Sequence, residues 1–119
     1  MMAVKSTIDE INDFLMVVKA LVAAGNYDFI PRPKNNLTNL GINLRIALDM
    51  LLKITYKNYF NGPEQDDNPK FAGFIWEFGE DEEKYQIYIK LKIKDTSRGK
   101  LLCIMGFHKA DFSIRYLYK

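Results

Sequence analysis

Residues 85–94, YQIYIKLKIK, alternate strictly between apolar and polar side chains. Successive side chains of a β-strand point to opposite faces of its sheet, so this pattern predicts a strand with two unlike faces. One face is apolar and can meet a core: Tyr85, Ile87, Ile89, Leu91 and Ile93. The other presents one tyrosine and three lysines to solvent or to a ligand: Gln86, Tyr88, Lys90, Lys92 and Lys94. A slip of one residue would bury the lysines, so the pairing register should be firmly fixed.

The chain around this strand also favours extended structure. Residues 101–107, LLCIMGF, are apolar at nearly every position and predict a central strand, joined to the first by a hairpin loop at residues 95–99. Residues 74–78, FIWEF, are aromatic and compact and predict a third strand, followed by an acidic turn at residues 79–83. Residues 112–119 are expected to form a short final strand or an ordered tail.

The first half of the chain favours helices. Thr7 and Glu10 have the spacing of a capping box, apolar residues recur at helical spacing, and Gly25 follows the last of them. These signals predict a helix over residues 7–24. Asn43 can cap a second helix that carries Leu44, Ala47, Leu48, Leu51 and Leu52.

Three connecting segments lie between these elements. Residues 27–33 contain two prolines and predict a short extended segment or turn, which we interpret as a stiff connector. Residues 37–41 predict one or two helical turns ending at Gly41. Residues 61–69, NGPEQDDNP, are typical of a polar loop.

Helices followed by strands indicate an α+β domain, with N-terminal helices packed on one face of a small antiparallel sheet. The 119 residues, 48% hydrophobic and 27% charged, fit one globular domain spanning residues 1–119. Cys103 is the only cysteine and His108 the only histidine, so an internal disulfide and a Cys/His zinc site are excluded. We expect no cofactor and no membrane segment, and a cytoplasmic location.

Charge is unevenly distributed along the chain. Residues 84–119 carry nine Lys or Arg and two Asp or Glu, a net charge of +7, whereas residues 1–83 have a net charge of −5. A concentrated cationic surface suits an anionic partner, either a nucleic acid or an acidic protein. The alternative is a solvated, lysine-rich sheet face that only keeps the protein soluble.

The predicted sheet gathers several reactive side chains. Pairing Lys94 with Lys100 places Tyr88 opposite Gly106 and leaves His108 on the same open face, diagonal to Tyr88. Gly106 leaves space beside the tyrosine. Trp76 and Glu77 point to opposite faces, so only one of them can join this group.

Such a group has the chemistry that RNA cleavage without a metal requires. The reaction needs a base for the ribose 2′-hydroxyl, cations for the charge at phosphorus and an acid for the leaving 5′-oxygen. Histidine titrates nearest neutrality, packed lysines can hold a phosphate and lower the pKa of a neighbouring tyrosine, and open aromatic rings can stack on bases. From residue types alone, a structural histidine, a nucleic-acid-binding domain and a protein-binding module all remain open.

Three motifs occur in an order that resembles the MqsR group of type II toxins. They are WEFG at residues 76–79, YIKLK at residues 88–92 and GFHKA at residues 106–110. The ending RYLYK at residues 115–119 and the segment LLKITYKNYFNGP at residues 51–63 are also similar to that family. The likeness extends over most of the chain from about residue 14.

The resemblance implies a RelE-like fold and a metal-independent endoribonuclease that cleaves mRNA, in related toxins at the ribosome, and that a cognate antitoxin neutralises. Tyr88 matches the family's active-site tyrosine, and His108 matches the basic residue of the last motif. Glu77 stands where the family has glutamine and Asn61 where it has an active-site lysine, while Gly106 replaces a serine. These departures make an altered or lost activity an open alternative.

The sequence therefore predicts two sets of site residues. The catalytic set is His108, Tyr88, Lys90 and Glu77. The RNA-binding set is Lys92, Lys94, Trp76, Lys109, Arg115 and Lys119. No metal ligands are predicted. The competing hypotheses are a non-catalytic RNA- or ribosome-binding domain and a basic protein-interaction module.

Overall fold

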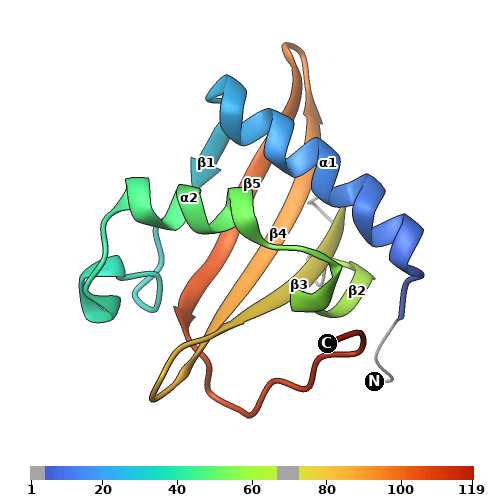
Figure 1. The fold of residues 1–119 in the computed structure, drawn as a ribbon. Helices are drawn as coiled ribbons and strands as arrows, with labels where there is room; N and C mark the ends of the chain where they lie inside the picture. Colours follow the sequence, from blue (N-terminus) through green and yellow to red (C-terminus); the bar gives the residue numbers. More distant parts are fainter. Residues whose placement is uncertain (1–4, 67–72) are drawn as a thin grey trace.

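The computed structural model describes residues 5–66 and 73–119, and within them two α-helices and two short 3-10 helices accompany a five-stranded sheet (Figure 1). In chain order the elements are α1 (Ile8–Ala24), β1 (Tyr27–Phe29), η1 (Leu37–Leu40), α2 (Leu44–Lys53), η2 (Tyr56–Asn58), β2 (Tyr59–Gln65), β3 (Phe74–Asp81), β4 (Gln86–Thr96) and β5 (Gly99–Lys109).

Both predicted α-helices are confirmed, and local signals explain where they begin and end. Thr7 caps α1 in a reciprocal capping box with Glu10, and Gly25 ends it in the left-handed conformation that only glycine adopts without strain. Asn43 caps α2 by accepting a hydrogen bond from the Ile46 amide at 3.0 Å. The short turn predicted before Gly41 is the 3-10 helix η1.

The sheet has the strand order β1-β5-β4-β3-β2 and is mixed, not purely antiparallel as the sequence predicted. β1 pairs parallel to β5, whereas the other neighbours are antiparallel. β1 has three residues and follows a helix, so its direction could not be read from its own residues.

The bounds of three predicted loops are wrong. Residues 61–65 belong to strand β2, although residues 61–69 were predicted to be a loop, of which residues 67–69 lie outside the described residues. β2 is an edge strand with register shifts on both sides of Asn61, which is where a sheet tolerates a Gly-Pro pair. β3 continues to Asp81, three residues into the predicted acidic turn. The β4–β5 loop contains only Ser97 and Arg98, because Thr96 pairs with Gly99.

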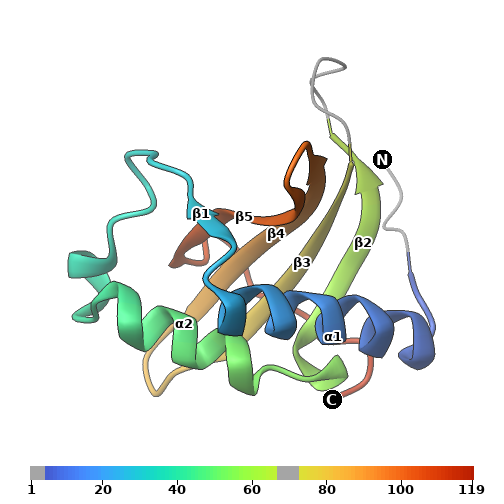
Figure 2. The same cartoon turned by 90° about the horizontal axis from the view of Figure 1, so that it is seen from above.

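The helices cover one face of the sheet, as the alternation in β4 predicts (Figure 2). Ile87, Ile89 and Leu91 of β4 are buried in the main core. The same core contains side chains from both helices and from the neighbouring strands: Ile11, Leu15, Val18, Ala47, Leu51, Phe78, Leu102, Ile104 and Phe107. Burial of this apolar surface is the main contribution to stability.

We call the other side of the sheet the open face, because no helix of the described residues lies on it (Figure 2). A second, smaller apolar cluster lies there, formed by Ile75, Cys103 and Met105 with Ile30 and Leu101 packed against them. None of the helices in the described part of the chain is long and apolar enough to span a membrane.

Candidate active site

Three central strands bring Glu77, Tyr88 and His108 together on the open face. Tyr88 of β4 pairs directly with His108 of β5 and with Gly79 of β3, and Lys90 pairs with Glu77. Directly paired residues share a face of the sheet. The rings of Tyr88 and His108 are 5.2 Å apart between centroids, so the two predicted catalytic side chains are in contact.

The register that achieves this differs from the predicted one. Lys94 pairs with Leu101 instead of Lys100, and a bulge at Met105 shifts the remaining pairs by one residue. A bulge places two residues of one strand against one of the other and changes the face on which later side chains lie. Near the loop the odd residues of β5 share the face of the lysines, whereas after the bulge the even residues, including His108, do so.

Tyr88 is a protonated hydrogen-bond donor. Its hydroxyl donates to Glu77 Oε2. Burial raises the pKa of the phenol far above its usual range, and the hydrogen bond to Glu77 and that carboxylate's charge raise it further. The prediction that neighbouring lysines lower the pKa of Tyr88 is therefore wrong, because the adjacent charge is a carboxylate.

Gly106 makes room for the tyrosine ring. A Cβ atom at this position would lie 3.1 Å from Tyr88 Cε2 and 3.0 Å from Lys90 Cβ, which is closer than ordinary packing allows. Gly106 pairs with Lys90 and not with Tyr88, yet the predicted space is present and the ring lies against it. The glycine thus fits the ring position seen here, which a serine would disturb.

His108 presents one ring nitrogen to the open face. Its Nδ1 atom lies 2.7 Å from the backbone carbonyl oxygen of Lys109. Because a carbonyl oxygen only accepts, Nδ1 carries the donated proton. Nε2 is then the nitrogen that can exchange a proton with a substrate.

β2 contributes a polar group next to Glu77. Asn61 pairs with Glu77 across the strands, and its side-chain amide donates to Glu77 Oε1 at 2.7 Å and to Glu64 Oε2 at 2.9 Å. Asn61 is buried, so these bonds fix the carboxylate of Glu77 on one side while Tyr88 holds it on the other. Glu77 is therefore the residue of the Trp-Glu pair that joins the site.

Two phenylalanines complete the surroundings of Tyr88. Phe60 of β2 and Phe112 of the C-terminal segment lie 6.1 and 6.0 Å from its ring, and 6.0 Å from each other, between centroids. Phe112 is 54% exposed. Sequence reasoning missed both, because it assigned no element to Phe60 and because Phe112 reaches the site only through the course of the tail.

The three lysines of β4 have different environments. Lys92 is buried, and its ammonium forms a 3.0 Å ion pair with Asp66, so the prediction that it faces solvent is wrong. Lys94 is exposed near the β4–β5 loop. Lys90 is half-buried beside Glu77 and Gly106, and in the described part of the chain no hydrogen bond or ion pair involves its ammonium group. Lys90 is thus the lysine of this row that the structure places at the site.

The other predicted RNA-binding residues lie apart from this cluster. Trp76 points to the helix side, where its ring stacks on Phe14 at 4.4 Å between centroids. The Lys109 ammonium lies 4.8 Å from the centroid of the Tyr85 ring. Lys109 pairs with the core residue Ile87, so it belongs to the helix side of the sheet. Arg115 is exposed on the tail, and Lys119 pairs with Asp81.

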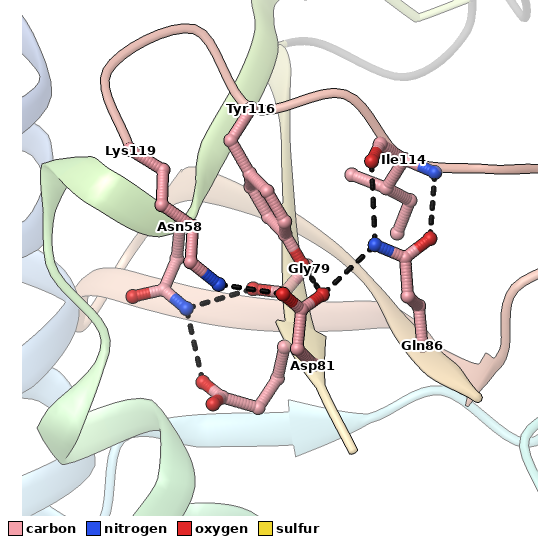
Figure 3. A network of polar contacts seen from close by, with 8 residues as sticks. Asn58, Gly79, Asp81, Gln86, Ile114, Tyr116 and Lys119 are labelled. Carbon is pink, nitrogen blue, oxygen red and sulfur yellow. Dashed lines mark hydrogen bonds and ion pairs between the residues drawn. The ribbon is translucent and has the colours of Figure 1, made fainter. Parts of the chain in front are cut away.

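The C-terminal segment, residues 110–119, is an ordered tail held by Asp81 and Gln86 (Figure 3). Asp81 accepts hydrogen bonds from Lys119, Gln86 and Tyr116 at 2.6 to 2.8 Å. These bonds, the Lys119 bond first, lower the pKa of Asp81 to about 2. The side-chain oxygen of Gln86 accepts from the Ile114 amide at 2.7 Å, so the tail is fixed where it passes the site.

The described residues contain no group of three or more histidine, cysteine, aspartate or glutamate side chains placed to hold a metal ion. Comparison with known proteins gives no match: neither a family model, nor a curated protein, nor a solved structure is similar to the chain. The case for a function therefore depends on the chemistry of this cluster.

Proposed function

We propose that the protein is the toxin of a type II toxin–antitoxin pair and an endoribonuclease that cleaves mRNA without a metal ion. The observation that carries the proposal is the convergence of Asn61, Glu77, Tyr88 and His108 on the open face. These are the positions that the resemblance to MqsR toxins relates to active-site residues. Two helices on one face of a sheet agree with the RelE-like fold that we propose with it.

In the proposed reaction the ribose 2′-oxygen attacks phosphorus and the 5′-oxygen leaves, which produces a 2′,3′-cyclic phosphate and a 5′-hydroxyl. The 2′-hydroxyl gives its proton to Tyr88 Oη as the phenol proton passes to Glu77 Oε2 along the existing hydrogen bond. His108 Nε2, protonated beforehand, supplies a proton to the leaving 5′-oxygen. The Lys90 ammonium stabilises the negative charge that develops on the phosphate oxygens.

The negative charge of the site favours a second candidate function. Glu77 and Glu64 both approach Asn61, and Lys92 is already neutralised by Asp66. Two carboxylates beside the proposed phosphate position oppose RNA binding unless cations offset them. A domain that binds RNA or the ribosome and has lost the cleavage reaction is consistent with this arrangement.

Cleavage of a transcript by the purified protein in excess chelator tests the proposal. His108→Ala and Tyr88→Phe should each lower the cleavage rate about 10²- to 10⁴-fold, the usual contribution of a proton-transfer group. Arg45→Ala, an exposed change on α2, is the control and should leave the rate unchanged. Regulated expression of the same variants in a bacterium should give growth arrest for wild type and control only.

The result separates the candidates. Equal rates for wild type and the two site variants would contradict the proposed reaction centre. Salt-sensitive RNA binding without cleavage would favour the non-catalytic domain. Neutralisation of the growth arrest by the product of an adjacent gene would support the toxin–antitoxin assignment, including the expected antitoxin partner.

A further inference from the structure

The loop at residues 30–36 lies along the edge of β5 beside the site, and Asn35 fixes it there. The side-chain amide of this buried residue donates to the carbonyl oxygens of Met105 and Ile30, each at 3.0 Å. Its side-chain oxygen accepts from the Phe107 amide, also at 3.0 Å. One asparagine therefore attaches the loop to both sides of Gly106.

This attachment occurs where β5 has no neighbouring strand on its outer edge. β1 pairs with Leu102, Cys103 and Ile104 only, and the Ile30 amide continues the contact by donating to Ile104 O at 3.0 Å. Beyond that point the Asn35 side chain takes the place of a strand partner. Buried backbone groups require such partners, so the loop position is determined by the sheet.

The loop carries Arg32 between Pro31 and Pro33. Proline fixes its own backbone and restricts the preceding residue to extended geometry, so the arginine is held on a stiff segment. Arg32 is exposed, and within the described residues no hydrogen bond or ion pair involves its guanidinium group. The positive charge of its guanidinium lowers the pKa of the Tyr88 phenol, although burial and Glu77 raise that pKa by more.

The same loop lines a groove that reaches His108. Pro33, Lys34 and Asn36 line this groove together with His108 and Lys109, and its volume is about 290 Å³. Arg32 lines an adjoining groove of about 630 Å³, which shares Pro33 and Asn36 with the first. Lys34 is paired with Asp111 at 2.5 Å, which neutralises its charge. Of the two cations on this loop, Arg32 is thus the one left to attract an anion.

We propose that Arg32 binds the substrate phosphate beside Tyr88 and His108, and that Asn35 is the positioning residue that holds its loop at the site. This inference rests on the proposed function. A phosphodiester next to Glu77 and Glu64 brings a third negative charge to the site, and Lys90 alone does not balance these charges. Arg32 supplies a second cation. Arginine suits the role because its planar fork donates two parallel hydrogen bonds to phosphate oxygens.

Arg32→Ala tests the first part, with Arg45→Ala as the matched loss of an exposed arginine on α2. The readouts are kcat/KM on a transcript that the wild type cuts and the Kd of a mixed-sequence RNA 12-mer with 2′-deoxy sugars. Arg32→Ala should weaken both about 10- to 100-fold. It should also reduce the slope of log Kd against log salt by about 0.7, the value for one phosphate contact on a single strand. Arg32→Lys should restore part of the loss.

Asn35→Asp tests the positioning role. Aspartate can accept from the Phe107 amide but cannot donate to the carbonyl oxygens of Met105 and Ile30. A positioning role predicts that Arg32→Ala costs much less in kcat/KM in the Asn35→Asp background than in the wild type. A purely structural role predicts lower stability with an undiminished effect of Arg32→Ala.

The outcomes distinguish this inference from the proposed function. Cleavage by the wild type with equal values for Arg32→Ala and Arg45→Ala would overturn the inference and leave the proposed function intact. Binding of the 12-mer without cleavage, lost in Arg32→Ala, would support Arg32 and contradict the nuclease. Neither cleavage nor binding by the wild type would overturn both.

Discussion

The open face has two halves built from the same alternating strand. Near the β4–β5 loop, in what we call the loop half, Lys92 is buried between Ile75 and Cys103 and paired with Asp66. Farther along, in the site half, Tyr88 and His108 are partly exposed, and Tyr88 is bonded to Glu77. The difference comes from Asp66 and Ile30, which lie outside both strands and close the first half only.

This comparison shows how one pattern yields a closed region and a more accessible polar region. In the loop half a charge has been removed from water, and its partner compensates it. In the site half, the polar groups stay partly exposed to solvent. The following predictions test that division, beginning with the largest expected effect.

Lys92→Met should lower the free energy of unfolding by about 3–5 kcal/mol, because it leaves the buried Asp66 carboxylate without its ammonium partner. Lys94→Met, two residues along on the same face but exposed, should change it by less than about 0.5 kcal/mol. Urea denaturation measures both. Similar losses in the two variants would break the distinction between a closed and an open half.

Lys90→Met should affect cleavage and leave stability almost unchanged, unlike Lys92→Met. Lys90 lies in the site half without an ion pair among the described residues, so the unfolding free energy should change by less than about 1 kcal/mol. Cleavage should fall about tenfold or more, because one stabilising charge near the phosphate is lost. A stability loss as large as that of Lys92→Met, with cleavage unchanged, would assign Lys90 to the structural half.

Gly106→Ser should destabilise the protein by about 1–3 kcal/mol, the usual range for overpacking. The added Cβ would press on Lys90 Cβ and on the Tyr88 ring, and so loosen the bond between Tyr88 and Glu77. Gly106→Ala separates the effect of the Cβ from that of the hydroxyl, and both variants should lose equal activity. Greater activity in the serine variant would show that the site half accepts the serine that MqsR toxins have at this position.

Asp81→Asn should have the smallest effect and should appear only in the pH dependence of unfolding. The pKa of Asp81 is lowered to about 2, so its ionised form stabilises the folded state. That contribution is complete above the unfolded value near 4 and is lost as the pH falls toward 2. Because Asp81 is 43% exposed, the difference should be below about 1 kcal/mol. If the unfolding free energy of the wild type and of Asp81→Asn changed identically between pH 5 and 2, the bonds of Asp81 to the tail would not stabilise the protein.

Local signals predicted much of the fold. The capping box at Thr7 and Glu10, the glycine after α1 and the alternation of β4 each act through residues close in sequence. They therefore gave both helices and the core face of β4. The shared face of Tyr88 and His108 was also predicted, but from a hairpin register that the structure does not have. β2 was missed because Gly62 and Pro63 are turn residues in most settings and are tolerated here by an edge strand.

The remaining features depend on partners that no local pattern reveals. Asp66 neutralises Lys92 from 26 residues away, and Asn35 bonds to Met105 from 70 residues away. The pairing of Lys94 with Leu101 and the Met105 bulge together replace the expected diagonal of Tyr88 and His108 with a direct pair. Arg32 was not considered, since two prolines suggested only a connector, and the tail position of Phe112 is defined by Asp81 and Gln86.

Because of the extra residue in β5, the odd residues face the open side before Met105 and the even residues face it after Met105. Losing a single codon there would turn the imidazole of His108 toward the helices while every other residue type stayed the same. Length changes in this strand are thus far more damaging than most point changes in it. An alignment of related chains should accept no gap between Leu101 and His108, even where the identities are low.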